Sequence, residues 1–224
     1  TTTHIMKPDF LSDESYIENE DLGQLANIFT NLKKNTLPLA ALGIPEKVVN
    51  SNVKWRSPSS DFCEKTAEFS KKFSTKNPYK FLKILCEGDG SKRLPIKLPK
   101  DGEPVFFPKT DTVIGVIGLS CLGKPIKETL FRYELLPNLT SLDNYFIKSL
   151  QSADIVTTDF LYRLCLSEKG LRKNITSQKF CIIFNQADIV DEKTLAEVIA
   201  LRNQLQTKGI CSHIISVKNN YIIG

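Results

Sequence analysis

Short, almost wholly apolar runs constrain the fold of this chain more than any other feature. Two of them, at 112–119 (TVIGVIGL) and 179–184 (KFCIIF), have the composition of parallel strands that are buried on both faces. A third apolar run, at 81–86 (FLKILC), also reads as a strand. Segments with helical spacing alternate with these runs. We therefore expect an α/β fold with a mainly parallel sheet and helices on both faces.

The helices carry recognisable signals at their ends. Apolar residues at helical spacing predict one helix over 21–34 and another that begins near residue 60, capped by Ser60 or Asp61. The last helix, at about 191–208, ends before Gly209 in the way that helix C-termini favour. A final strand is predicted at 212–217, continued by 221–223.

The length of 224 residues fits one large domain or one domain with a small subdomain. We expect one nucleotide-binding-like α/β domain over 1–224, with a variable segment at 36–80. Residues 43–58 read as irregular, with Trp55 as an anchor beneath a loop. The β-branched threonines of the opening TTTH look like the tail of a strand. The domain is therefore expected to be truncated at its N-terminus, with a first strand and phosphate loop upstream.

Charge and hydropathy limit the partners. The formal net charge of +5 is small for this length, and the basic residues are scattered among acids, so binding to nucleic acid is not expected. No apolar run is long enough to span a bilayer and no signal-peptide pattern opens the chain. We expect a soluble cytoplasmic protein without a membrane partner.

The cysteines do not form a recognisable metal or redox motif. There are six, and none has CxxC or CxxxH spacing, so neither a zinc site nor a thioredoxin-like centre is predicted. Buried free thiols are the expected state, as in a reducing cytoplasm. His213, inside the last apolar strand, is interpreted as structural.

Two acids and two glycines follow the apolar run at 81–86. Glu87 and Asp89 would emerge at the carboxyl end of that strand, where open parallel sheets bind ligands. Gly88 and Gly90 would let the backbone approach a metal-bound phosphate closely. Asp-Gly is also a common turn, and that alternative stays open for this dipeptide.

A basic, proline-rich loop comes next. Its cations alternate with prolines that fix φ and stiffen the chain. We interpret the loop as a preshaped wall for an anionic ligand. The cations are Lys92, Arg93, Lys97 and Lys100.

Residues 118–125 (GLSCLGKP) come within one position of the phosphate loop G-x-x-x-x-G-K-[ST]. The last position of that loop supplies a hydroxyl to Mg²⁺ and a backbone N–H to phosphate, and Pro125 has neither group. We predict a turn from strand to helix with Pro125 at the first helical position.

Residues 185–188 read Asn-Gln-Ala-Asp directly after a strand, where guanine-nucleotide proteins carry N-K-x-D. A carboxylate at the last position accepts two hydrogen bonds from the guanine edge. Gln186 replaces the lysine that would pack on the base. Asp188 could instead help to start the following helix through Asp191.

Together, five segments resemble the YqeC-type selenium-dependent hydroxylase accessory proteins, and the block EGDGSKRLP…EP is the most specific of them. The segments are Thr1–His4 (TTTH), Glu87–Pro104 (EGDGSKRLPIKLPKDGEP), Val113–Pro125 (VIGVIGLSCLGKP), Arg132–Glu134 and Phe184–Asp188 (FNQAD). The resemblance implies a P-loop NTPase-like fold and a part in the maturation of molybdenum hydroxylases that carry labile selenium.

On this resemblance we expect an accessory factor that binds GTP or ATP with Mg²⁺ and could hydrolyse it. Asp89 would hold the metal and Glu87 would orient or activate the attacking water. Thr2, Thr3, Gly90, Ser91 and Lys97 would line the phosphates. Asn185 and Asp188 would read the base.

Two alternatives remain for the function. The protein could be a non-catalytic chaperone or scaffold that binds a molybdopterin dinucleotide or a client molybdenum hydroxylase. It could also be a small-molecule kinase of the same fold, with an acceptor pocket near Lys97 and Arg132.

Overall fold

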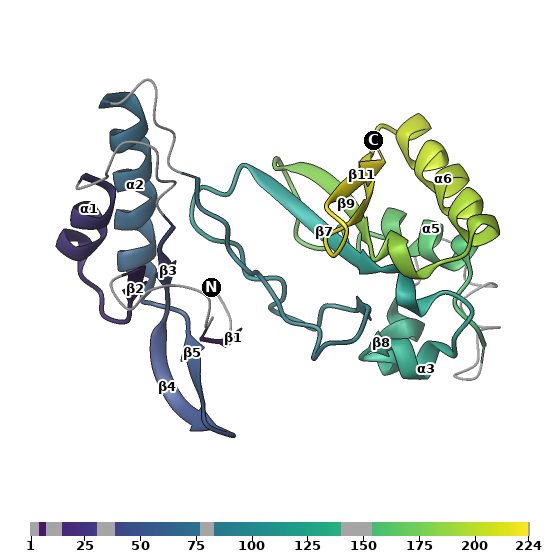
Figure 1. The fold of residues 1–224 in the computed structure, drawn as a ribbon, viewed down its shortest axis with the longest axis horizontal. Coiled ribbons are helices and arrows are strands. Elements are labelled where there is room, and N and C mark those ends of the chain that lie inside the picture. The colour runs from purple at the N-terminus through teal and green to yellow at the C-terminus, as the bar shows by residue number, and fades with distance from the viewer. Residues whose placement is uncertain (1–4, 8–14, 31–38, 77–82, 140–153, 224) are drawn as a thin grey trace. The chain divides into compact units, whose positions relative to one another are not determined.

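The structure, a computed structural model, describes residues 5–7, 15–30, 39–76, 83–139 and 154–223. The chain divides into two compact units (Figure 1). The N-terminal unit comprises Thr1–Gly90 and Val105–Lys109, and the C-terminal unit comprises Ser91–Pro104 and Thr110–Gly224. The expectation of a single domain stays a prediction.

The N-terminal unit combines two helices with short strands. Strands β1, β5 and β4 form an antiparallel sheet in that order, and β2 pairs in parallel with β3. The elements are β1 (Ile5–Met6), β2 (Tyr16–Ile17), α1 (Leu22–Thr30), β3 (Ala41–Leu42), β4 (Ile44–Val49), β5 (Asn52–Arg56) and α2 (Ser60–Lys76).

Helices α1 and α2 pack through aromatic side chains. The ring centroids of Phe29 and Phe73 lie 6.1 Å apart in an edge-on arrangement. Helix α2 is capped by Ser59, whose Oγ accepts a hydrogen bond of 3.2 Å from the Phe62 N–H. The prediction of Ser60 or Asp61 as the cap was therefore wrong by one or two residues. The predicted end of α1, at 31–34, lies outside the described residues.

The segment 43–58, predicted as irregular, is instead a β-hairpin formed by β4 and β5. Asn50 and Ser51 make its turn with φ of 49° and 65°, so the chain reverses between two strands of mixed polarity. Trp55 is the predicted anchor: it is fully buried, and its indole N–H donates to Glu18 Oε1 at 3.0 Å.

The strand predicted at 81–86 is not present in the part of that run that the structure describes. Residues 83–90 have no regular secondary structure. Leu85 is 89% exposed, so the apolar run is not covered by a core. Just after this run, the Gly88 carbonyl accepts a hydrogen bond from Val105 N–H at 3.1 Å. An apolar run becomes a buried strand only where a sheet pairs with it and other elements cover it.

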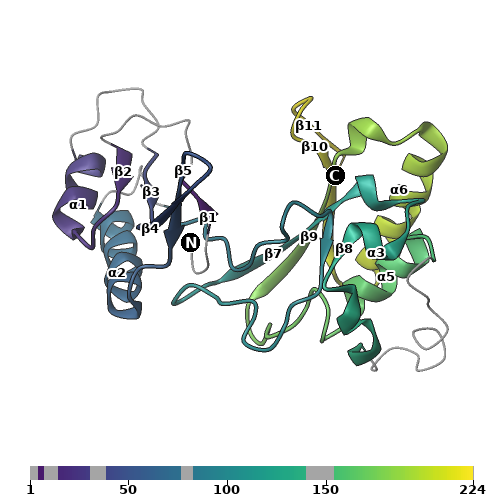
Figure 2. The same ribbon diagram turned by 90° about the horizontal axis from the view of Figure 1, so that it is seen from below.

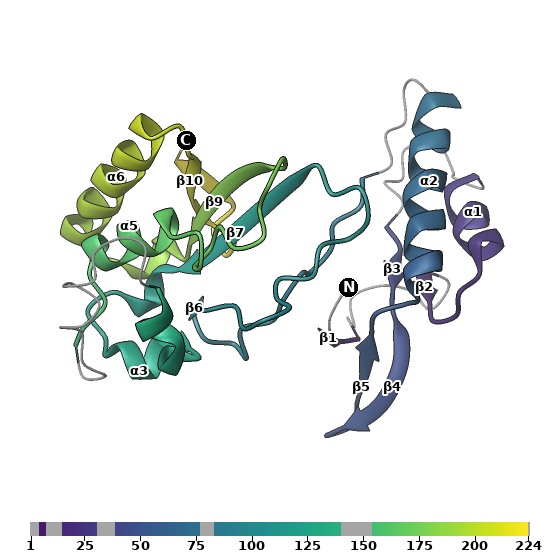
Figure 3. The same cartoon turned by 180° about the vertical axis from the view of Figure 1, so that it is seen from behind.

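The C-terminal unit contains a four-stranded sheet in the order β11–β10–β9–β7, in which β7, β9 and β10 run parallel and β11 is antiparallel (Figure 3). The elements of this unit are β6 (Ile96–Lys97), β7 (Thr112–Gly118), η2 (Leu119–Cys121), α3 (Ile126–Thr129), β8 (Leu130–Phe131), η3 (Tyr133–Asn138), α5 (Thr158–Leu166), β9 (Lys179–Asn185), η4 (Ala187–Ile189), α6 (Glu192–Thr207), β10 (Cys211–Ser216) and β11 (Tyr221–Ile223).

The strands predicted at 112–119 and 179–184 are confirmed by β7 and β9. The last helix is also confirmed: Asp191 caps α6 by accepting from Thr194 N–H at 2.7 Å, and Gly209 follows with a φ of +75°. Residues 221–223 do not continue β10. They fold back against it as β11.

The described helices of this unit lie on one face of the sheet, not on both (Figure 2). Ile182, Phe184 and Ile214 point toward them and are fully buried in the core with residues of α5 and α6. Ile114 and Val116, on the opposite face of β7, are about half exposed. The α/β class with largely parallel strands is confirmed, and likeness to P-loop NTPases stays a prediction. Among the described residues, no helix is long and apolar enough to cross a membrane.

Candidate functional site

The carboxyl ends of β7, β9 and β10 meet at one edge of the sheet. Gly118, at the end of β7, is paired with Asn185, at the end of β9. Polar groups from the turns that follow these strands converge there, at the edge where open α/β sheets bind ligands. We call this the strand-end site, and it comprises residues 118–120, 185–188 and 216–217.

Asn185 fixes the backbone on both sides of the site. Its Oδ1 accepts from Gln186 N–H at 2.8 Å and from Val217 N–H at 3.4 Å. The side-chain amide thus links the end of β9 to the residue that follows β10.

Asp188 is held by a serine from the neighbouring strand. The Ser216 hydroxyl donates to Asp188 Oδ1 at 2.7 Å, and its oxygen accepts from Asn219 N–H at 3.1 Å. This hydrogen bond lowers the pKa of Asp188, which favours the carboxylate. Ser216 was not predicted as a site residue. The available signal was a hydroxyl side chain at the last position of an apolar strand.

Asp188 does not cap the following helix, because Asp191 performs that role. The helix start through Asp191 is as the alternative expected, and a contribution of Asp188 to it stays a prediction. Base binding by Asn185 and Asp188 stays a prediction.

Gln186 takes up the left-handed backbone conformation, with a φ of 71°. Its Oε1 accepts from Ser120 N–H at 3.3 Å, so it ties the end of β9 to the turn after β7. Gly118 makes room for this contact, since a Cβ there would lie only 2.7 Å from Gln186 Oε1. Gln186, which stands at the lysine position of N-K-x-D, thus holds together two turns of the strand-end site.

The turn at 118–125 has the predicted structure of a strand that leads through η2 into α3, although Pro125 is the N-cap and not the first helical residue. Its backbone amides are already used by the chain. Gly123 N–H donates to Val156 O at 3.0 Å, Lys124 N–H to Cys121 O at 3.1 Å, and Ile126 N–H to Asp154 O at 2.8 Å. A phosphate loop needs such amides for its ligand, so this turn does not have the form of a phosphate cradle.

A family model described as YqeC protein matches residues 1–134. The chain belongs to the YqeC family. A search of curated proteins and a search of solved structures found no match. The YqeC match covers the N-terminal unit and the C-terminal unit as far as Glu134.

The residues predicted to hold phosphate and metal in this YqeC-family protein are divided between the units. Glu87, Asp89 and Gly90 belong to the N-terminal unit, and Ser91 and Lys97 to the C-terminal unit. A Cβ on Gly90 would lie 3.4 Å from Glu87 Oε1. Glu87 and Asp89 each interact with other groups of the chain.

Thr2 and Thr3 lie outside the described residues. The roles assigned to all seven of these phosphate and metal residues stay predictions.

Lys97 lies in a buried ion cluster of the YqeC-matched segment. Its Nζ is 2.7 Å from Glu103 Oε2, and Arg132 donates to both carboxylate oxygens of Glu103. The Arg132 hydrogen bonds, assisted by Lys97, lower the pKa of Glu103 to about 2. Lys92, Lys97 and Arg132 also lie near the Phe131 ring, at 5.0, 5.9 and 4.7 Å from its centroid.

The basic loop reaches the strand-end site at Pro95. The Pro95 carbonyl accepts from Gly118 N–H at 2.9 Å, so the segment that carries Lys92 and Arg93 passes the end of β7. Both of these cations are exposed. The C-terminal unit therefore brings together an oriented carboxylate, an amide and a basic segment at one edge of the sheet.

Proposed function

We propose that this YqeC-family protein binds a guanine nucleotide at the strand-end site and acts as an accessory factor in the maturation of selenium-dependent molybdenum hydroxylases. The observation that carries the nucleotide proposal is the Asp188 carboxylate, ionised and oriented by Ser216 at the carboxyl edge of β7, β9 and β10. The two oxygens of a carboxylate match two N–H donors on one edge of a base, and each oxygen can accept more than one hydrogen bond, so the Ser216 contact leaves Oδ1 able to accept another.

Guanine fits this site better than adenine. Guanine presents its ring N1–H and its 2-amino group side by side, and both can donate to one carboxylate. Adenine presents an amino group beside a ring nitrogen that accepts, so it would leave one carboxylate oxygen unmatched. A desolvated acceptor without a partner costs binding free energy.

The phosphates would lie toward the basic segment, where Lys92 and Arg93 are exposed beside Pro95. A carboxylate is the hard oxygen ligand that Mg²⁺ prefers, and on the family resemblance alone we propose Asp89 for this role, with Glu87 close to it in sequence. On this proposal, Asp89→Asn abolishes Mg²⁺-dependent hydrolysis and leaves the base preference unchanged.

Family membership supports the accessory role, because the resemblance to YqeC-type proteins implies a part in hydroxylase maturation. A selenium-dependent molybdenum hydroxylase produced in cells should become active with the wild-type chain and stay inactive with Asp188→Asn. Equal activation by both chains would contradict a role for the strand-end site in maturation.

Calorimetric titration of the full chain with GTP, ATP and CTP in the presence of Mg²⁺ tests nucleotide binding. GTP should bind most tightly. Ser216→Ala should weaken GTP about tenfold, which corresponds to about 1.4 kcal/mol, because Asp188 loses the hydroxyl that orients it.

Ser212→Ala is the matched control. It makes the same chemical change on β10, where Ser212 contacts the Arg202 carbonyl at 3.4 Å, away from the strand-end site. GTP affinity should stay at the wild-type value in this variant. Absence of binding by all three nucleotides would contradict the proposal, and binding of a molybdopterin dinucleotide alone would favour the chaperone alternative.

A further inference from the structure

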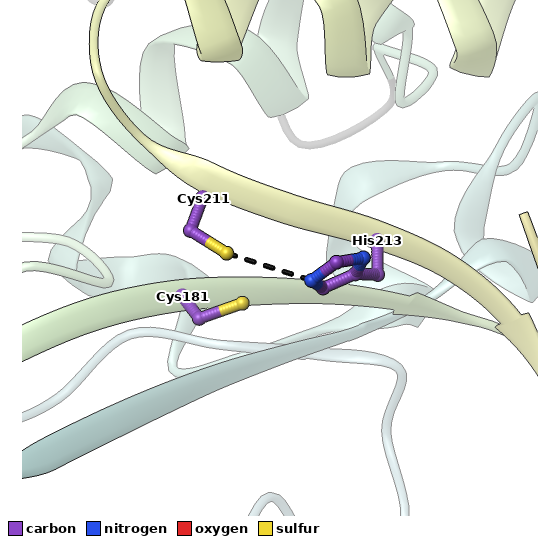
Figure 4. Close-up of side chains that lie close together, drawn as sticks. All are labelled: Cys181, Cys211 and His213. Carbon is purple, nitrogen blue, oxygen red and sulfur yellow. Dashed lines mark hydrogen bonds between the residues drawn. The ribbon is translucent and has the colours of Figure 1, made fainter. Parts of the chain in front are cut away.

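Two cysteines and a histidine lie together on the face of the C-terminal sheet that α5 and α6 do not cover (Figure 4). Cys181 in β9 and Cys211 in β10 are register partners in the parallel pair. His213 follows Cys211 by two residues and therefore projects from the same face. One ligand atom from each residue lies within 4.8 Å of the others.

The imidazole is oriented for a ligand role. His213 Nε2 is directed at the sulfurs and lies 3.5 Å from Cys211 Sγ (Figure 4). Nδ1 is buried, and among the described residues it has no hydrogen-bond partner. A donor at Nδ1 would force the ring proton onto Nε2. Since the described part of the chain places no donor there, the ring can carry its proton on Nδ1 and direct the Nε2 lone pair at a cation.

The two sulfurs come from neighbouring strands and face the same imidazole nitrogen. A pair of adjacent thiols beside an imidazole nitrogen is a donor set for a thiophilic metal.

We propose that Cys181, Cys211 and His213 bind a zinc ion through two thiolates and Nε2, with the fourth position open. Two sulfurs and one imidazole nitrogen are ligands that zinc favours in tetrahedral sites. The two thiolates would balance the charge of the ion. An open fourth position on the sheet face opposite α5 and α6 admits water or a ligand atom from a partner.

This site is separate from the proposed nucleotide site and from the YqeC-matched residues, which end at 134. Cys181 precedes Asn185 by four residues in β9, so about 13 Å of strand separates the zinc ligands from the strand-end site. The zinc would cross-link β9 to β10. A failure to bind zinc would therefore not contradict nucleotide binding, and a failure to bind nucleotide would not contradict the zinc site.

Metal titration of the full chain, reduced and freed of metal, tests the site. Co²⁺ should bind with one equivalent and give the visible bands of a tetrahedral ion together with a thiolate-to-cobalt charge-transfer band, and Zn²⁺ should displace it. Cys181→Ser, Cys211→Ser and His213→Ala should each weaken Zn²⁺ binding by about 100-fold or more, since even changes outside the ligand set cost 10- to 100-fold.

Cys86→Ser is the matched control. Cys86 is partly exposed in the irregular segment of the N-terminal unit. Its replacement by Ser should therefore leave the affinity for Zn²⁺ unchanged. X-ray absorption of the wild-type zinc complex gives a result that does not depend on the folding of any variant. It should show sulfur neighbours at about 2.3 Å and nitrogen at about 2.0 Å. A shell of oxygen and nitrogen alone, failure of the wild-type chain to bind Zn²⁺, or equal loss of affinity in Cys86→Ser would overturn the proposal.

Discussion

At the scale of single residues, the densest charge interactions of the C-terminal unit surround Glu103. Its side chain is 15% exposed, and the Lys97 and Arg132 side chains that pair with it are 7% and 16% exposed. A charged side chain with so little contact to water has lost most of its hydration free energy, and the Glu103 carboxylate offsets that loss for both cations. Glu103 therefore contributes to folding chiefly by neutralising its two partners.

Replacing Glu103 with Gln should destabilise the protein markedly. The variant keeps the shape of the side chain but removes the negative charge that both Lys97 and Arg132 contact, so the free energy of unfolding should fall by about 3 kcal/mol. Asp61→Asn is the control, because Asp61 pairs with Lys65 on the exposed side of α2 and should cost less than about 0.5 kcal/mol. Urea unfolding measures the free energy of unfolding of both variants. An equal loss in the two would contradict the stabilising role given to Glu103.

The same carboxylate predicts a pH dependence. The pKa of Glu103 falls from its ordinary value of 4.5 to about 2 in the folded protein. Between these values the unfolded chain binds a proton that the folded chain does not, so acidification favours unfolding. The stability difference between wild type and Glu103→Gln should therefore be full above pH 4.5 and shrink toward pH 2. A difference that stays constant in urea unfolding over this range would show that Glu103 is not the group that titrates.

At the scale of elements, the end of β7 is the tightest junction of the strand-end site. A Cβ on Gly118 would lie 2.7 Å from Gln186 Oε1 and 2.9 Å from Pro95 Cβ. Gly118→Ala should thus push the basic segment and the turn after β9 away from β7, at a cost of about 1–3 kcal/mol. It should also weaken GTP binding.

Gly115→Ala provides the control for that variant within the same strand. Its Cβ would lie 3.4 Å from the Phe180 ring, which is close to an ordinary contact. Its stability and nucleotide affinity should remain near wild type in the same unfolding and titration experiments. An equal loss of stability and nucleotide affinity in both variants would contradict the prediction, because it would show that an added methyl group disturbs β7 at either position.

Sequence patterns predicted the elements whose signals are local. β7 and β9 are nearly all apolar, and α6 has Asp191 and Gly209 at its ends. The run at 81–86 has the same composition as a buried strand, but composition does not say whether another element covers it. The β4–β5 hairpin was missed because its strands mix apolar and charged residues and carry Pro45.

The sequence predicted the site residues that follow a strand directly, and it did not predict those that depend on which strands lie side by side. Asn185 and Asp188 follow a predicted strand directly, so their place at the sheet edge could be predicted. Ser216 could not, because its contact with Asp188 depends on β10 lying beside β9. The proposed zinc ligands were not predicted from the sequence, and His213 was interpreted as structural, because strand register and not sequence spacing brings Cys181 to Cys211.

At the scale of the whole molecule, the predicted nucleotide residues are distributed over both units, and the YqeC match spans parts of both. The base-binding residues all belong to the C-terminal unit and lie beyond residue 134. The central claim of the account is therefore that Asp188 reads a guanine base.

A swap of nucleotide preference tests that claim most directly. Asp188→Asn replaces two acceptors with one acceptor and one donor, which matches xanthine, whose C2 carries a carbonyl in place of the amino group of guanine. Asp191→Asn removes the same charge three residues away and keeps a good helix cap. Calorimetric titration should show that Asp188→Asn loses GTP affinity and gains XTP affinity, whereas Asp191→Asn retains the wild-type preference for GTP. Unchanged GTP affinity in Asp188→Asn, or an equal loss for GTP and XTP, would contradict the account.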